Sequence, residues 1–208
     1  MRLFLAILLA ATLAACGGST KMATLPAGTP VLAFGDSVTF GFGAGPGEDY
    51  PRQLATISGW NVSNAGISGE TADAARARIN AALEENKPAL VLIEIGGNDF
   101  LHRRPEAAVK EDIRAIVTAV RQAGATPVLI AVPRAGILNA VAGRLDDSGI
   151  YAELAKEERV LLVSSVFSNV LSDAALRSDA IHPNASGYRK LAEGIAAALA
   201  KTGLLAKR

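Results

Sequence analysis

From Pro30 onward, short runs of apolar residues alternate with segments that have the spacing of amphipathic helices. The first run, Val31 to Phe34, ends at Gly35. An unbroken apolar run of this kind is typical of a strand buried on both faces of a parallel sheet. Further strands are expected at 60–65, 89–95, 126–132 and 159–164, and helical segments at 50–58, 70–85, 105–123, 151–158 and 185–200. The alternation predicts a doubly wound α/β domain.

The length and charge of the chain limit its organisation and its partners. With 208 residues, half of them apolar, the chain can bury one substantial core and is short for two. We therefore expect one domain over residues 30–208. The formal net charge is only +1. This balance leaves no extended basic face, so no nucleic-acid partner is expected.

The first fifteen residues have the pattern of a signal peptide. Met1 and Arg2 form a short charged end, Leu3 to Leu13 is apolar, and Ala14-Ala15 supply the small residues of a processing site. The apolar run is well short of the roughly 20 residues that span a bilayer, which disfavours a permanent transmembrane helix. The pattern predicts that the protein leaves the cytoplasm.

Cys16 follows this segment and is the only cysteine. The string Leu13-Ala14-Ala15-Cys16 resembles the bacterial lipobox, in which the cysteine is lipidated and becomes the new amino terminus. Residues 16–29 would then be a lipidated end and a flexible tether. Gly17 after the cysteine favours sorting to the outer membrane in lipoproteins, so we expect a periplasmic protein anchored there. The alternative is an ordinary cleaved signal peptide with an incidental cysteine.

Asp36 and Ser37 follow the first predicted strand directly. A positive φ at Gly35 would turn the chain sharply and present both side chains at the carboxyl edge of the sheet, where open α/β folds bind ligands. Ser37 is therefore a candidate nucleophile. The alternative is that Asp36 or Ser37 only caps a following helix, since both residue types favour that position.

The chain has two histidines, and His182 is the stronger candidate for a general base. An imidazole with an ordinary pKa of about 6.5 is partly neutral at neutral pH and can accept a proton. Asp179, three residues earlier, could orient the ring and stabilise its protonated form. The rival, His102, lies in a polar loop with no acidic residue just before it.

Two further loops carry residues for which the sequence allows more than one role. Asn98, in Gly96-Gly97-Asn98-Asp99, follows the strand at 89–95, but asparagine in such a turn is often structural. The glycine-rich stretch at 41–47 fits neither a dinucleotide fingerprint nor a P-loop. Phe40, just before this stretch, and Phe42, within it, either line an acyl pocket or close the core.

Four ordered strings resemble the conserved blocks of the SGNH (GDSL) hydrolases. They are Gly35-Asp36-Ser37, Asn64-Ala65-Gly66, Gly96-Gly97-Asn98-Asp99 and Asp179-Ala180-Ile181-His182-Pro183. The similarity is greatest to the periplasmic thioesterase, lysophospholipase and arylesterase branch. It implies a three-layer α/β/α domain of flavodoxin-like type, with five parallel strands in the order 2-1-3-4-5.

The resemblance also implies a role for each residue type. Ser37 would attack an acyl carbon, His182 would carry the proton, and Asp179 would orient the imidazole. The backbone N–H groups of Ser37 and Gly66 and the side-chain amide of Asn98 would form the oxyanion hole. Gly66 would suit this task because a missing side chain lets the substrate approach closely. Asp36 and Asp99 would be hydrogen-bonding supports. No metal or cofactor is implied, and we expect a monomer.

The expected activity is that of a serine esterase acting on short or medium acyl esters, thioesters or lysophospholipids. Phe100, Leu101, Ile137 and Leu138 are candidates for an apolar acyl pocket. The stretch from Val132 to Asp147 departs from the substrate-loop pattern of the family, which leaves substrate choice open. The alternatives are a carbohydrate O-acetyl esterase and, outside enzymes, a noncatalytic binding lipoprotein.

Overall fold

The computed structural model describes residues 22–134 and 144–206. Cys16, the predicted signal peptide, Ile137 and Leu138 lie outside the described residues. Five strands form one parallel sheet in the order β2-β1-β3-β4-β5. Their bounds are β1 Pro30–Gly35, β2 Asn61–Gly66, β3 Leu90–Glu94, β4 Thr126–Ile130 and β5 Leu161–Val163. The predicted fold and strand order are confirmed.

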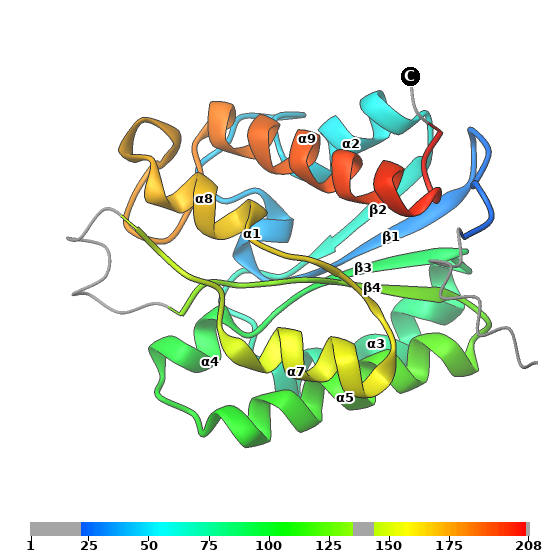
Figure 1. The fold of residues 1–208 in the computed structure, drawn as a ribbon, viewed down its shortest axis with the longest axis horizontal. Coiled ribbons are helices and arrows are strands. Elements are labelled where there is room, and N and C mark those ends of the chain that lie inside the picture. The colour runs from blue at the N-terminus through cyan, green and yellow to red at the C-terminus, as the bar shows by residue number, and fades with distance from the viewer. Residues whose placement is uncertain (1–21, 135–143, 207–208) are drawn as a thin grey trace, which may run out of the picture.

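Helices cover both faces of this sheet and give the molecule three layers (Figure 1). On one face lie α1 Ser37–Phe40, α2 Tyr50–Ser58, α8 Val166–Ser172 and α9 Ala185–Thr202. The other face is covered by α3 Ala72–Asn86, α4 Gly97–Leu101, α5 Glu106–Gln122 and α7 Gly149–Glu158. A short 3₁₀ helix, η1, spans Ala174–Leu176.

The sequence of each strand matches its place in the sheet. The side chains of β1 from Val31 to Phe34 and all those of β3 are buried, as expected of central strands covered on both faces. β2 is an edge strand, and its polar residues Asn61, Ser63 and Asn64 are exposed. The strands with continuous apolar sequences therefore lie in the centre of the sheet, and the strand with polar residues lies at this edge.

The register aligns the ends of three strands. Gly35 of β1 pairs with Gly66 of β2 on one side and with Glu94 of β3 on the other. Because parallel strands end at the same edge, the segments that follow these residues emerge side by side. β1 also lies between β2 and β3, so the chain moves to opposite sides of β1 in forming them. This is the position at which open α/β sheets bind ligands.

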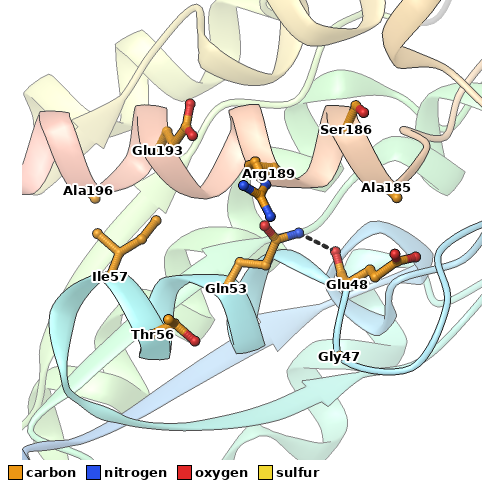
Figure 2. A pocket seen from close by; sticks show the side chains of 10 residues that line it. All are labelled: Gly47, Glu48, Gln53, Thr56, Ile57, Ala185, Ser186, Arg189, Glu193 and Ala196. Atoms are coloured by element: carbon orange, nitrogen blue, oxygen red, sulfur yellow. Dashed lines mark hydrogen bonds between the residues drawn. The ribbon is translucent and has the colours of Figure 1, made fainter.

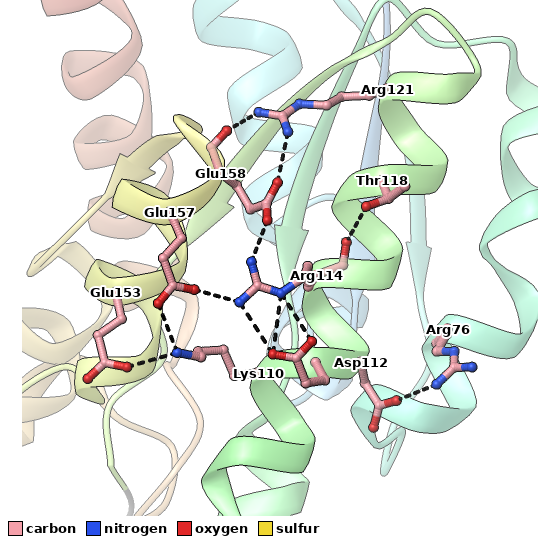
Figure 3. A network of polar contacts seen from close by, with 10 residues as sticks. Arg76, Lys110, Asp112, Arg114, Thr118, Arg121, Glu153, Glu157 and Glu158 are labelled. Carbon is pink, nitrogen blue, oxygen red and sulfur yellow. Dashed lines mark hydrogen bonds and ion pairs between the residues drawn. The ribbon is translucent and has the colours of Figure 1, made fainter.

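Ion pairs join α5 to α7 across the outer surface (Figure 3). Lys110 contacts Glu153 at 3.1 Å and Glu157 at 3.2 Å. Arg114 contacts Glu157 at 2.5 Å, and Arg121 contacts Glu158 at 3.0 Å. Each exposed pair contributes little by itself, typically under about 1 kcal/mol. The connected set links the two helices on the face opposite α9.

Within residues 22–134 and 144–206, no helix combines the length and the apolar character needed to cross a bilayer.

Candidate active site

Ser37 lies at the start of α1, directly after β1. Asp36 is the N-cap residue, and its Oδ1 accepts a hydrogen bond from the Val38 amide at 3.0 Å. The capping alternative therefore holds for Asp36, while Ser37 is the first residue inside the helix. The first N–H groups of a helix have no acceptor within the helix, so the Ser37 amide is left available by the fold itself.

The two glycines at the ends of β1 and β2 have roles that differ from the predicted ones. Gly35 does not have a positive φ, so the predicted reason for this glycine was wrong. A Cβ at Gly35 would instead lie 1.9 Å from the Glu94 carbonyl oxygen. At Gly66 a Cβ would lie 2.1 Å from the Phe40 amide nitrogen. The missing side chain of Gly66 therefore makes room for the backbone of α1.

Ser37, His182 and Asp179 form a continuous hydrogen-bonded chain. Ser37 Oγ lies 2.9 Å from His182 Nε2, and His182 Nδ1 lies 2.7 Å from Asp179 Oδ2. Ser37 and His182 are 145 residues apart in the sequence, and both are buried in the structure. The Asp179 contact fixes the proton on Nδ1, which leaves Nε2 free to accept the serine proton.

The Asp179 carboxylate is held in place by its own loop. Its Oδ1 accepts hydrogen bonds from the Ile181 and His182 amides, both at 2.8 Å. Partial burial alone would raise the pKa of Asp179, but the hydrogen bonds from the His182 ring and from these two amides hold it below its ordinary value. The group is thus an anion at neutral pH, as an orienting acid must be.

The loop that carries His182 closes on itself before α9. The Ser178 amide donates to the His182 carbonyl at 2.9 Å, and Arg177 forms an isolated antiparallel bridge with Pro183. Asn184 then caps α9 by accepting from the Gly187 amide at 3.0 Å. A closed loop fixed to a long helix holds the imidazole in one orientation.

Phe42 contacts the imidazole from the glycine-rich stretch after α1. Its ring centroid lies 4.5 Å from that of His182, at an interplanar angle of 39°. Phe40 is 56% and Phe42 47% exposed, so the alternative in which they close the core is wrong. The sequence offered no signal for the contact between Phe42 and His182.

Asn98 lies at the same edge of the sheet, in the first turn of α4. Its Nδ2 donates to the Glu70 carbonyl at 2.9 Å and to Asp36 Oδ2 at 3.3 Å. The Gly66 amide donates to Asn64 Oδ1 at 2.9 Å. In the sequence Asn64 is visible only as part of a motif, and nothing there signals this contact. The structure thus gathers Ser37, Gly66 and Asn98 around neighbouring strand ends.

A profile of the "GDSL-like Lipase/Acylhydrolase family" matches residues 33–190 of this chain. The chain belongs to this family.

Curated relatives agree with that assignment. "Thioesterase 1/protease 1/lysophospholipase L1" of Escherichia coli K12 is 33% identical over 172 residues, which is 80% of this chain and 81% of the relative. "Esterase TesA" of Pseudomonas aeruginosa is 29% identical over 88% of this chain and 94% of its own length. The solved structure "Crystal Structure of TesA" has a TM-score of 0.72 at 29% identity and covers 83% of this chain and 98% of its own.

Two buried acids of this GDSL-family site lie behind the nucleophile. Burial raises the pKa of Asp36 to about 7; the Val38 amide opposes the shift, and the charges of Asp99 and Glu70 add to it. Glu94 is fully buried, and its pKa is raised well above the ordinary value, first by burial and then by the charge of Asp36. Both groups therefore keep their protons to higher pH than in the unfolded chain.

Asp99 supports the edge of the sheet from the other side. It is fully buried, its Oδ2 accepts from the Ala72 amide at 2.8 Å, and its Oδ1 pairs with Arg104. It therefore ties the start of α3 to α4. This contact agrees with the supporting role that the resemblance implies.

A small pocket with a volume of about 40 Å³ opens next to Ser37 and His182. Its apolar lining consists of Val38, Leu101, Val132, Pro133, Phe167, Leu171 and Ile181. Phe100 is not among the lining residues; it packs against the core and meets Tyr151 edge-on at 6.4 Å. The assignment of Phe100 to the pocket was therefore wrong, while Leu101 lies where it was expected.

His102, the rival base, is exposed at the end of α4 and does not line this pocket. Among the residues that the structure describes, no group of three or more His, Cys, Asp or Glu side chains is arranged to hold a metal ion.

A larger groove, of about 820 Å³, lies between α2 and α9 (Figure 2). Polar residues such as Glu48, Gln53 and Arg189 line it, and neither Ser37 nor His182 is among the lining residues. Its size alone does not connect it with the chemistry of the smaller pocket.

Proposed function

We propose that the protein is a serine esterase that hydrolyses carboxylic esters or thioesters with short to medium acyl chains through an acyl-enzyme intermediate. The observation that carries this proposal is the chain of hydrogen bonds from Ser37 through His182 to Asp179, with distances of 2.9 and 2.7 Å. Membership of a lipase and acylhydrolase family supports the reaction class.

In the first half of the reaction, Ser37 Oγ attacks the acyl carbon while His182 Nε2 takes its proton. The carbonyl π electrons move onto the oxygen and form a tetrahedral oxyanion. Its collapse breaks the bond to the alcohol or thiol, which leaves with the proton from Nε2. Water then repeats the sequence on the acyl-enzyme and releases the acid.

The oxyanion would be held by the amides of Ser37 and Gly66 and by the Asn98 side chain. Two of these donors have protein acceptors at present, since Gly66 donates to Asn64 and Asn98 to Asp36 and Glu70. A substrate oxygen would share or replace the longer of the Asn98 contacts, the one to Asp36 at 3.3 Å. Loss of one such donor typically costs about 3 kcal/mol of transition-state stabilisation.

The acyl group would occupy the apolar pocket next to Ser37. Leu101, Val132 and Phe167 line this pocket, and its narrowness favours short chains. The relatives named thioesterase, lysophospholipase and arylesterase suggest the ester classes to test.

Hydrolysis of p-nitrophenyl acetate and butyrate by the purified protein tests this function. Ser37→Ala and His182→Ala should each lower kcat by about four orders of magnitude or more, because the members of such a triad act as one unit. Circular dichroism should show that both variants are folded. His102→Ala is the matched control and should retain wild-type kcat/KM; if His102→Ala were inactive and His182→Ala active, the assignment of the base would be wrong.

Substrate class is decided by comparing kcat/KM for aryl esters, acyl-CoA, lysophospholipid and acetylated sugar. We expect an aryl ester, thioester or lysophospholipid to be preferred. Preference for the acetylated sugar would favour the carbohydrate O-acetyl esterase instead, and no turnover of any of them would favour a noncatalytic binding protein.

A further inference from the structure

The guanidinium of Arg78, on α3, contacts the carboxyl ends of β1, which leads into Ser37, and of its neighbour β2. Its Nη2 donates to the Ala65 carbonyl of β2 at 2.8 Å and to the Gly35 carbonyl of β1 at 3.4 Å. Its Cζ lies 4.1 Å from the centre of the Phe34 ring. The side chain is 24% exposed, so most of it is enclosed by the domain.

The contact with Ala65 acts directly on a proposed oxyanion donor. The Ala65 carbonyl and the Gly66 N–H are the two ends of one planar peptide group. A hydrogen bond that fixes the carbonyl oxygen therefore fixes the direction of the N–H as well. The backbone of Phe40 packs so closely against Gly66 that a Cβ there would not fit. The peptide is therefore packed against α1 and also hydrogen-bonded to Arg78.

Arg78 reaches a second proposed donor through Glu70. Nε and Nη2 of Arg78 each contact one oxygen of the Glu70 carboxylate at 2.5 Å. The backbone carbonyl of Glu70 in turn accepts from Asn98 Nδ2 at 2.9 Å. Glu70 is 8% exposed, so this two-point contact lies largely out of water. Displacement of Glu70 would move the acceptor that orients the Asn98 amide.

We propose that Arg78 is a positioning residue that sets the geometry of the oxyanion hole, an inference that rests on the proposed esterase function. One planar guanidinium joins the peptide of Gly66 to the residue that orients Asn98. Its charge is balanced by Glu70 at 2.5 Å, so its effect comes from the geometry of the fork and not from a free positive charge.

Arg78→Lys tests this geometry because lysine keeps the charge and loses the planar fork. We expect kcat for p-nitrophenyl acetate to fall by about 30-fold or more, because small misplacements of catalytic groups cost about this much. KM should change by less than about threefold, since the donors act on the transition state and not on bound ester. The imidazole titration of His182, followed by NMR, should match that of the wild type.

Arg76→Lys is the matched control. Arg76 lies on the same helix, is 59% exposed and pairs with Asp112 of α5 at 3.0 Å. It should retain wild-type kcat. Glu70→Gln weakens the fork from its other side, and we expect it to lower kcat in the same direction. Its effect should not add to that of Arg78→Lys, because both act through one contact.

The outcomes separate this inference from the proposed function. If the wild type is active and Ser37→Ala inactive, but Arg78→Lys and Glu70→Gln match Arg76→Lys in kcat, the inference is overturned and the esterase function stands. A fall in kcat with an altered His182 titration also overturns it, because the triad itself would then have moved. A wild type without ester hydrolysis overturns both.

Discussion

Glu94 lies at the end of β3 as an acid buried among apolar strands. The Thr39 hydroxyl donates to its Oε2 at 2.8 Å, and Thr39 Oγ1 lies 3.1 Å from the Tyr50 hydroxyl. Among residues 22–134 and 144–206, nothing donates to Glu94 Oε1. A buried carboxyl with one accepting oxygen unpartnered is cheaper to keep protonated than ionised.

This burial gives the protein a pH-dependent stability. The pKa of Glu94 is raised in the folded protein. When the pH rises above the ordinary pKa of a glutamate, the unfolded chain therefore loses the carboxyl proton of Glu94 while the folded chain keeps it. The free energy of unfolding must then fall with rising pH until the folded group also ionises. Asp36, whose pKa burial raises to about 7, contributes a slope of the same sign from about pH 4 to pH 7.

Glu94→Gln removes the titrating group and keeps its shape. We expect its free energy of unfolding to exceed that of the wild type by an amount that grows as pH is raised from about 4 to 8, because glutamine has no proton to lose. Urea denaturation of both proteins across this range measures the difference. Parallel pH profiles would contradict the account of Glu94.

The residues of the site could be assigned from the sequence, but the structural reason why a given residue type is needed at its position often could not. Ser37, Asp179 and His182 have side chains whose chemistry is visible in the sequence, and the structure brings all three together. The reason for Gly66 lies in the backbone of Phe40, and that for Gly35 in the carbonyl of Glu94. Such close approaches between distant segments leave no local pattern.

At the scale of elements, the packing of α1 over the end of β2 decides where Ser37 lies. A Cβ at Gly66 would meet the Phe40 amide nitrogen at 2.1 Å and the Thr39 carbonyl carbon at 2.6 Å. These are backbone atoms of α1, the helix that begins with Ser37. If they shifted to make room for a Cβ, the nucleophile would shift with them.

Gly66→Ala should therefore displace α1. We expect a loss of about 1–3 kcal/mol in the free energy of unfolding, as overpacking typically causes. The value of kcat/KM for p-nitrophenyl acetate should fall by about 100-fold, because the serine and two donors would shift. Gly149→Ala is the control: Gly149 begins α7, and its Cβ would have nothing within 4 Å. That change should stabilise the protein by up to about 1 kcal/mol. Equal effects of the two changes would contradict the packing account.

The long elements could be predicted because their periodicity extends over many residues. The helix at 50–58 has the predicted bounds, and α5, predicted over 105–123, spans Glu106–Gln122. Of the short helices, α1, of 4 residues, was expected only in the alternative in which Asp36 or Ser37 caps a helix, and α4, of 5 residues, was not predicted. A single turn is too short to show a helical period. Asp36 caps α1, whereas the side chains of Asn98 and Asp99 bind α4 to neighbouring segments.

At the scale of the whole molecule, parallel topology brings the site together. β1, β2 and β3 end at one edge, and the loop before α9 supplies the histidine to the same place. The common edge of the strand ends could be expected from the alternation of strands and helices, whereas the place of the histidine loop was implied by the resemblance to the SGNH hydrolases. The separation of Phe100 from Leu101 could not be expected, because it depends on which way α4 faces Tyr151 and the core.

Attachment of the whole protein to a membrane is our proposal from its first sixteen residues. If Cys16 is lipidated and becomes the new amino terminus, the membrane fraction of a bacterium that produces the protein should contain it. Cys16→Ser should move it to the soluble fraction while leaving esterase activity unchanged. The same fractionation for both proteins would contradict lipid anchoring.

The most direct test of the central claim, that His182 activates Ser37 as the nucleophile, is covalent trapping with a phosphonate ester followed by peptide mapping. The wild type should carry one phosphonyl group, on Ser37, and lose esterase activity in proportion to labelling. The Ser37→Ala variant should carry none, and His182→Ala should be labelled far more slowly. An inactivated enzyme labelled at another residue, or equal labelling of Ser37 with and without His182, would contradict the claim.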